Sequence, residues 1–172
     1  MSDAATGEPL IRPATTADGD SLGRLGALLV QEHFEFDPRR FLAPNPSTPA
    51  LYAAFLLSQL EEPRAVVMVA DRGGAVIGYA YGAVEGYDYM ALRGPAAILH
   101  DLIVAPEWRG RGVGRALVHA TITALAVQGA PRVVLSTAER NQSAQRFFER
   151  IGFRRTMVEL TRELEARDAR SR

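Results

Sequence analysis

Residues 98–128 form a strand, a glycine-rich turn and a helix in direct succession. The apolar run 98–104 is typical of a buried strand. Three glycines follow within 110–114, and mostly small apolar residues then recur at helical spacing until Gly129 and Pro131 end the helix. The order of the elements along the whole chain predicts a mixed α/β sheet with helices on both faces.

The glycine turn predicts a site for a phosphorylated cofactor. The first N–H groups of a helix have no partners inside it, and the helix dipole is positive at that end. Glycines let a phosphate approach those N–H groups without a Cβ in the way. Arg109, Arg111 and Arg115 add positive charge around the turn. A glycine-rich turn that binds no ligand is the alternative that this stretch alone leaves open.

The glycine spacing differs from that of two common nucleotide loops. A dinucleotide turn reads G-x-G-x-x-G directly after its strand, and a triphosphate loop reads G-x-x-x-x-G-K-[ST]. Here the spacing is G-x-G-x-G. The segment Arg109-x-x-Gly112-x-Gly114 instead resembles the acetyl-coenzyme A signature [QR]-x-x-G-x-[GA] of the GNAT N-acetyltransferase superfamily.

A later segment resembles a second motif of the same superfamily, N-x-x-A-x-x-[FL]-Y-x-x-x-G-F. The matching residues are Asn141-x-x-Ala144-x-x-Phe147-Phe148-x-x-x-Gly152-Phe153. Asn141 is also a good helix N-cap, and Gly152 a good helix end. The two motifs stand in the family's order, and the resemblance covers roughly residues 64–160.

The resemblance implies the GNAT fold, of the mixed α/β (α+β) class. Its central, mostly antiparallel sheet of six to seven strands is flanked by about four helices. The sequence places strands at 10–12, 65–70, 75–85, 98–104, 132–137 and 153–160. We expect a single GNAT domain over residues 1–172, with flexible ends at 1–8 and 162–172.

The family's cofactor roles carry over to matching positions. The backbone of the central strand is expected to pair with the pantetheine arm of acetyl-coenzyme A, and one of its N–H groups to polarise the thioester carbonyl. The strand residues concerned are Leu102, Ile103 and Val104. The residues expected to hold the pyrophosphate are Arg109, Gly110, Arg111, Gly112, Val113, Gly114 and Arg115. Asn141 is expected to face the cofactor near its pantetheine.

One position departs from the family's pattern. The usual general acid is a tyrosine directly after the phenylalanine or leucine of the late motif, and here Phe148 takes its place on the cofactor side. A phenylalanine cannot donate a proton. Water, Ser143 or one of the tyrosines could do so instead, and a thiol with a pKa near ~8.5 is a tolerable leaving group.

Three residues are candidates for the catalytic base: His100, Asp101 and Glu85. The stretch Leu99-His100-Asp101-Leu102 resembles L-E-D-[LF] of the polyamine acetyltransferases, in which the glutamate works as base, and histidine has a suitable pKa. His100 and Asp101 alternate, so they can face the same side of the sheet only if a β-bulge or similar irregularity interrupts the strand. A strand-edge histidine bonded to backbone is the alternative for His100.

The strand predicted at 75–85 has two unlike faces. Its large residues alternate onto one face: Ile77, Tyr79, Tyr81 and Glu85. The residues between them are mostly glycine or alanine, which lets a helix pack closely. The aromatic face, with its terminal carboxylate, is a candidate wall for a substrate pocket, and Tyr87 and Tyr89 extend it if the strand continues.

Composition excludes several classes of function. The formal net charge is zero, which argues against a broad nucleic-acid footprint. The chain has no cysteine, and therefore no disulfide, cysteine-ligated zinc or acyl-cysteine intermediate. No apolar run approaches membrane length. We expect a cytoplasmic protein without a metal, nucleic-acid or membrane partner.

These features together predict an N-acetyltransferase that moves an acetyl group from acetyl-coenzyme A directly to a primary amine of a small molecule or peptide. The alternative, which Phe148 favours, is a non-catalytic GNAT-fold module that binds acyl-coenzyme A as a sensor or interaction partner. Carboxylates and aromatics on the acceptor side predict an amine with a hydrophobic or aromatic body. The resemblance also implies a homodimer.

Overall fold

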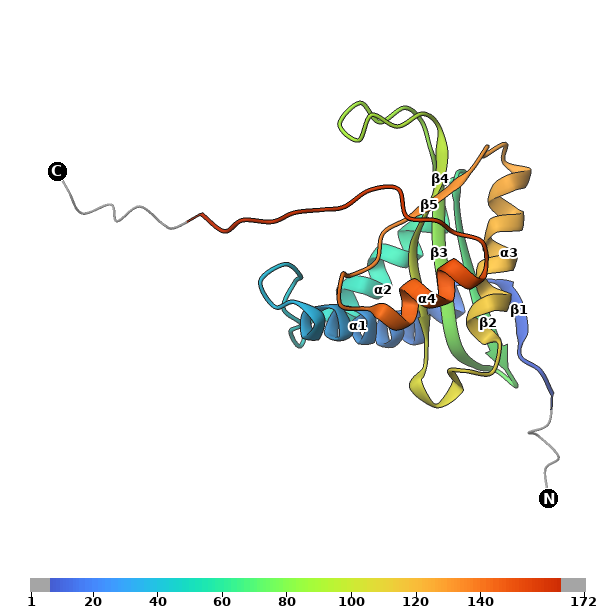
Figure 1. Ribbon diagram of the computed structural model, residues 1–172. Helices are drawn as coiled ribbons and strands as arrows, with labels where there is room; N and C mark the ends of the chain where they lie inside the picture. The colour runs from blue at the N-terminus through green and yellow to red at the C-terminus, as the bar shows by residue number, and fades with distance from the viewer. Residues whose placement is uncertain (1–6, 165–172) are drawn as a thin grey trace, which may run out of the picture.

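The computed structural model describes residues 7–164, which form a five-stranded sheet in the order β1-β2-β3-β4-β5 (Figure 1). The strands are β1 (Leu10–Pro13), β2 (Ala65–Arg72), β3 (Ala75–Glu85), β4 (Ala96–Val104) and β5 (Val133–Leu135). The helices are α1 (Gly19–Phe36), α2 (Thr48–Gln59), α3 (Val113–Val127) and α4 (Gln142–Arg150), with 3₁₀ turns at Thr16–Asp18 and Pro106–Trp108.

The predicted mixed α/β fold with a mostly antiparallel sheet and about four helices is confirmed. Strands β1 to β4 pair antiparallel with their neighbours, and β5 joins β4 in parallel. Helices α1 and α2 cover one face of the sheet, and α3 and α4 cover the other (Figure 1). The glycine-alanine face of β3 lies under α3, because a Cβ on Gly78 would stand 3.3 Å from Leu117 Cδ1.

The predicted number of strands, six to seven, is wrong for the described residues. Residues 153–160 were expected to form a last strand, but the chain leaves the end of α4 and runs away from the sheet (Figure 1). Residues 154–164, which we call the arm, are exposed throughout. A strand pattern becomes a strand only beside another strand edge, and the arm does not return to β5. Most of the ends predicted to be flexible lie outside the described residues.

The strand predicted at 75–85 also differs in detail. Strand β3 ends at Glu85, so Tyr87 and Tyr89 do not extend it and lie in the loop that follows. A register shift against β2 makes Ile77 an extra residue, and it packs on the α3 side rather than with Tyr79. Tyr79 and Tyr81 are buried under α1 and α2, whereas Glu85 is partly exposed.

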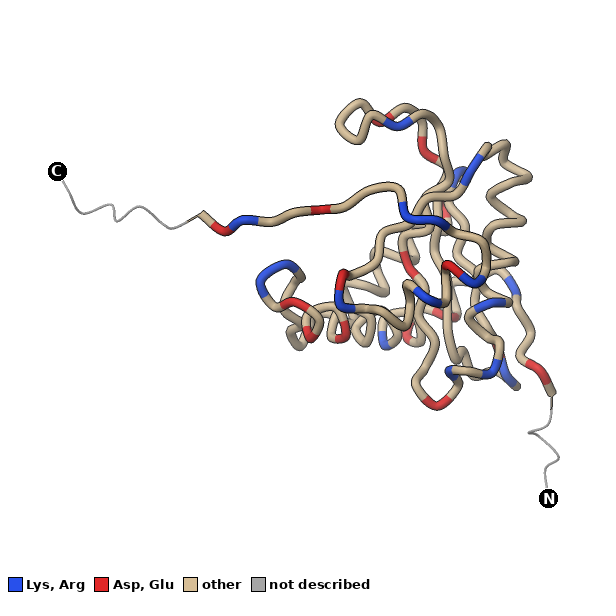
Figure 2. Tube along the Cα trace, viewed as in Figure 1, with Lys and Arg blue, Asp and Glu red and all other residues tan. Residues whose placement is uncertain are grey.

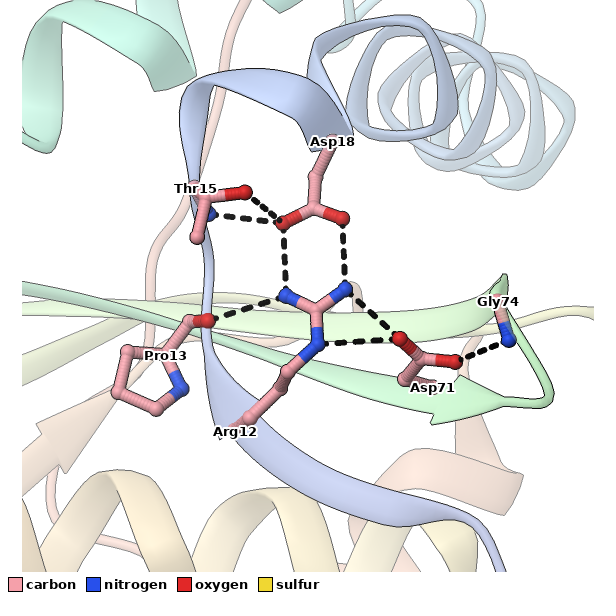
Figure 3. Close-up of polar contacts among 6 residues, drawn as sticks. All are labelled: Arg12, Pro13, Thr15, Asp18, Asp71 and Gly74. Atoms are coloured by element: carbon pink, nitrogen blue, oxygen red, sulfur yellow. Dashed lines mark hydrogen bonds and ion pairs between the residues drawn. The ribbon is translucent and has the colours of Figure 1, made fainter.

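The first strand is fastened by one arginine (Figure 3). The Arg12 guanidinium forms two hydrogen bonds of 2.8 Å with Asp18 at the start of α1 and two more with Asp71 at the end of β2. Hydrogen bonds from Arg12 lower the pKa of Asp18 to about 2. The network ties β1 and β2 to α1, the helix that covers the candidate site.

Candidate active site

A β-bulge in β4 sets the geometry of the candidate site. Tyr81 of β3 pairs with Asp101, and the next residue, Gly82, pairs with Leu99, so His100 is the extra residue. The bulge resets the alternation, and both His100 and Asp101 contact tyrosines on the face that α1 and α2 cover. The condition under which the two residues can share a side is therefore met.

Asp101 is buried and accepts hydrogen bonds from two tyrosines. The hydroxyl of Tyr52 on α2 donates to its Oδ2 at 2.7 Å, and the hydroxyl of Tyr79 on β3 donates to the same atom at 2.9 Å. Burial raises the pKa of the Asp101 carboxyl, while the two hydroxyls oppose that rise. Burial also raises the pKa values of both tyrosines, so they remain neutral donors.

His100 and Glu85 form an imidazole–carboxylate pair at the edge of the same cluster. Nε2 of His100 lies 3.2 Å from Glu85 Oε1, and the imidazole stacks on the ring of Tyr81 with centroids 5.0 Å apart. The other oxygen of Glu85 accepts a hydrogen bond of 2.9 Å from Arg93. Glu85 is thus held by Arg93 and orients the imidazole. The described contacts of the His100 ring are with side chains rather than with backbone.

Strands β4 and β5 diverge next to Asp101. Their parallel pairing ends at Leu99↔Leu135, whereas β4 continues to Val104. The residues predicted to meet the pantetheine lie beyond that last pair: Leu102, Ile103 and Val104. A strand edge with unpaired N–H and C=O groups can bind an extended ligand.

The glycine turn leaves open space at the start of α3. Gly110 and Gly112 have φ values of +73° and +84°, and Gly112 is the N-cap of the helix. A Cβ on either residue would meet no atom within 4 Å. Val113 is buried, and a Cβ built on Gly114 would stand 3.8 Å from Cγ2 of Val104. Free space therefore lies beside the two glycines at the start of α3, as the close approach of a phosphate requires.

Arg109 is engaged within the fold. Its Nε donates to the carbonyl of Val104 at 2.8 Å, and its Nη2 bonds the carboxylate of Glu32 on α1. The guanidinium therefore joins the glycine turn to the end of β4 and to α1. A contact between Arg109 and the pyrophosphate stays a prediction.

The other two arginines of the turn are exposed. Arg111 lies over the ring of Trp108, 5.0 Å from its centroid, and Arg72 of β2 lies 4.4 Å from the same centroid. Arg115 lies on α3 beside a groove that Gly112 also lines. Arg111 and Arg115 are thus placed to attract an anion at the start of α3, although the structure does not test that role.

The late motif has two structural roles. Asn141 caps α4, as predicted, since its Oδ1 accepts a hydrogen bond of 3.0 Å from the N–H of Ala144. Phe148 is buried between Phe147 and Phe153, with centroids 5.0 and 5.5 Å from theirs. The expected contacts of Asn141 and Phe148 with the cofactor stay predictions.

Sequence reasoning missed the role of Tyr52. Helical spacing places it on the apolar side of its helix with Leu56, and gives no sign that its hydroxyl reaches Asp101, 49 residues away. The signal that existed was chemical: a carboxylate within a strand requires partners, and a nearby tyrosine supplies one.

Two negative findings concern residues 7–164. None of their helices combines the length and apolarity needed to span a membrane. Nor do three or more of their His, Cys, Asp or Glu side chains gather in a group suited to a metal ion.

Comparisons with known proteins identify the family of this chain. Residues 28–153 match the acetyltransferase (GNAT) family. An uncharacterised N-acetyltransferase of Mycobacterium bovis is 33% identical over 106 residues, or 60% of this chain and 62% of that protein. The mycothiol acetyltransferase of Thermobispora bispora is 34% identical over 92 residues, or 54% of this chain and 31% of that protein. The chain thus spans less than two thirds of the length of these curated relatives.

Solved structures show the same fold. A Bacillus halodurans protein, crystallised as a tetramutant, has a TM-score of 0.78 at 22% identity, covering 90% of this chain and 99% of that one. An aminoglycoside N-acetyltransferase in complex with coenzyme A has a TM-score of 0.71 at 18% identity, covering 94% of this chain and 98% of that one. At these identities the likeness establishes the fold alone.

Proposed function

Because this chain belongs to the acetyltransferase (GNAT) family, whose members use acetyl-coenzyme A, we propose that it transfers an acetyl group directly to a primary amine of a small molecule or peptide. The observation that carries the proposal is the β4 bulge. It gathers His100 and Asp101 on one face of the sheet, at the place where β4 loses its β5 partner. The bulge thus places two side chains suited to acid–base chemistry beside the edge of β4 that β5 leaves open.

The residues present fit the cofactor. Its pyrophosphate would lie against the open turn at Gly110 and Gly112, near Arg111 and Arg115, at the positive end of α3. Its pantetheine arm would hydrogen-bond β4 along residues 102–104, where the strand has no β5 partner and the Val104 carbonyl is already engaged by Arg109. Bound acetyl-coenzyme A supplies a thioester whose acetyl group an amine can take.

The chain's own residues then have distinct tasks. An N–H of β4 polarises the carbonyl to be attacked. The base that takes the amine's proton comes from the cluster of His100, Asp101 and Glu85. Phe148 supplies no proton, so the departing sulfur is protonated from another source.

The acceptor class follows from the charge and rings around the cluster. Carboxylates at Asp101 and Glu85 favour a cationic amine, and the exposed Tyr87 and Tyr89, stacked with centroids 6.3 Å apart, offer an aromatic surface at the same end of β3. We therefore favour an amine with a hydrophobic or aromatic body. In Figure 2 both charge signs are scattered over residues 7–164, which show no continuous basic stretch for a polyanionic acceptor.

A homodimer is part of the proposal, and the arm supports it. The arm exposes four large apolar residues, each at least 75% accessible: Met157, Val158, Leu160 and Leu164. Strand β5 is the last strand of the sheet, so within the described part of the chain no strand pairs with its outer edge. An unpaired extended segment and an open strand edge in one chain favour strand addition between two copies. A cytoplasmic location stays a prediction.

The proposed function is tested by measuring the release of coenzyme A thiol with a panel of primary amines. Each amine is used in a matched pair, one with an uncharged body and one whose body carries an added carboxylate or phosphate. We expect turnover with cationic amines that carry an aromatic or aliphatic body, and slower turnover when a carboxylate or phosphate is added. Glu85→Gln should reduce the difference in turnover between the amines with and without the added anionic group. Preference for the anionic amines would refute the acceptor class.

A further inference from the structure

The carboxylate of Asp101 is held asymmetrically. Both tyrosine hydroxyls reach Oδ2, and the described residues make no hydrogen bond to Oδ1. Among the described residues no fully buried side-chain oxygen or nitrogen lacks a partner, so Oδ1 keeps some accessible surface although Asp101 as a whole is only 9% exposed. One oxygen is thus fixed and the other is available.

The available oxygen lies in the right part of the chain. Asp101 lies in the part of β4 that has no β5 partner, because the pairing ends at Leu99 and β4 continues to Val104. His100, in contrast, already lies against Glu85 and the ring of Tyr81. Within the cluster, Asp101 is the acidic group next to the open strand edge.

We propose that Tyr52 and Tyr79 are positioning residues that hold Oδ2 of Asp101 and leave Oδ1 as the oxygen that takes the acceptor's proton. The inference rests on the proposed function. It assigns the base among the three candidates and adds two residues to the machinery. The acceptor ammonium loses a proton to Oδ1, its nitrogen forms a bond to the acetyl carbon, and the carbon–sulfur bond breaks. Of the two protons then left on nitrogen, one stays as the amide N–H and the other neutralises the departing thiolate, and Asp101 returns its own proton to solvent.

The hydroxyls of Tyr52 and Tyr79 also act on the pKa of the Asp101 carboxyl. Burial drives the Asp101 carboxyl toward its neutral form, in which it could not accept a proton at all. Hydrogen bonds from Tyr52 and Tyr79 favour the charged form, and His100 and His33 act in the same direction when they are protonated. The hydroxyl of Tyr81, the remaining neighbour, donates its hydrogen bond to Oε1 of Gln59 and not to Asp101.

The experiment compares Tyr52→Phe with Tyr81→Phe. Each variant removes one hydroxyl from the same aromatic cluster, but only the first hydroxyl reaches Asp101. The carboxyl carbon of Asp101 is titrated by NMR in protein without cofactor, and its signal is identified by its loss in Asp101→Asn. We expect the midpoint to rise by roughly one to two pH units in Tyr52→Phe, because a hydrogen bond to the charged form is lost, and to stay in place in Tyr81→Phe.

A second readout separates tuning from catalysis. The acid limb of kcat/KM against pH should move upward with the NMR midpoint in Tyr52→Phe, since the base must be ionised to act. An unmoved NMR midpoint would overturn the positioning role, and a moved midpoint with an unmoved acid limb would overturn Asp101 as the proton acceptor. If no amine is acetylated at all, the proposed function fails, and the NMR titration still decides the positioning role.

Discussion

Gly26 of α1 lies directly against the ring of Tyr52 on α2: a Cβ built on Gly26 would stand 2.1 Å from Cδ1 of that ring. No side chain fits in that space. The glycine therefore sets how deeply the Tyr52 ring lies between the helices, and with it the reach of the Tyr52 hydroxyl to Asp101.

Gly26→Ala should therefore force the two helices apart. We expect a loss of about 1–3 kcal/mol in the free energy of unfolding, which is typical of overpacking. Gly19→Ala in the same helix is the control, because its new Cβ would meet only the flexible tip of Leu57, at 3.1 Å. Urea unfolding measures both variants. Equal stabilities would mean that Gly26 does not hold Tyr52 in place.

The Arg12 network makes stability depend on acid. The pKa of Asp18 in the folded chain, about 2, lies below its ordinary value of 3.8, so the stabilisation is present above pH 4 and is lost as the pH falls from about 4 to about 2. This change is worth about 2 kcal/mol. Asp18→Asn should lower the free energy of unfolding at pH 7 and should make that free energy depend less on pH between about 4 and about 2. Asp20→Asn, at an exposed position, should change neither property much. An unchanged acid slope in Asp18→Asn would argue against this network.

Cofactor binding should depend on the glycine turn and not on helix α3 as a whole. At a hundredfold excess over the dissociation constant, coenzyme A should stabilise the parent chain by about 2.7 kcal/mol. Gly112→Val should abolish this gain without unfolding the chain. Gly129→Val is the matched control, because Gly129 has a φ of +86° and equally open surroundings beyond the other end of α3. If both variants lose the stabilisation by coenzyme A, or if neither loses it, the assignment of the cofactor site to the glycine turn is wrong.

The arm should decide the oligomeric state. Val158 and Leu160 have the same parity in an extended chain and are 76% and 91% exposed, so two aspartates there would disrupt pairing with a second copy. Light scattering at micromolar concentration should give a dimer for the parent and a monomer for Val158→Asp/Leu160→Asp. Thr161→Asp, which adds a charge without removing an apolar residue, should remain dimeric. A monomeric parent would refute the dimer.

The sequence predicted the fold well where structure follows from local chemistry. Strand β3, the glycine turn, the Asn141 cap and the helix end at Gly152 all depend on residues close together in the chain. The motifs added the family's order of strands and helices. Residues 153–160 carry a strand pattern as well, but whether a strand forms depends on a neighbouring edge that the pattern cannot specify.

The candidate site was predictable only in part. His100 and Asp101 were identified from their motif, yet strict alternation places them on opposite faces, and the register shift against β3 depends on pairing between strands. The register shift between β2 and β3 at Ile77 likewise makes strict alternation predict the wrong face for that residue. Tyr52 and Arg93 reach the site through contacts between distant elements, which no local spacing encodes.

The most direct test of the account is mass-spectrometric detection of an acetylated amine. The purified chain is incubated with acetyl-coenzyme A labelled in the acetyl group and a broad panel of primary amines and peptides. All 20 basic residues of the chain are arginine, so no lysine side chain of the enzyme can take the label. We predict labelled acetyl-amine products that depend on the enzyme and fall at least tenfold in Asp101→Asn, within the range typical of a lost acid–base group. Coenzyme A-dependent stabilisation without any labelled amine would contradict the account and identify a non-catalytic acyl-coenzyme A-binding module.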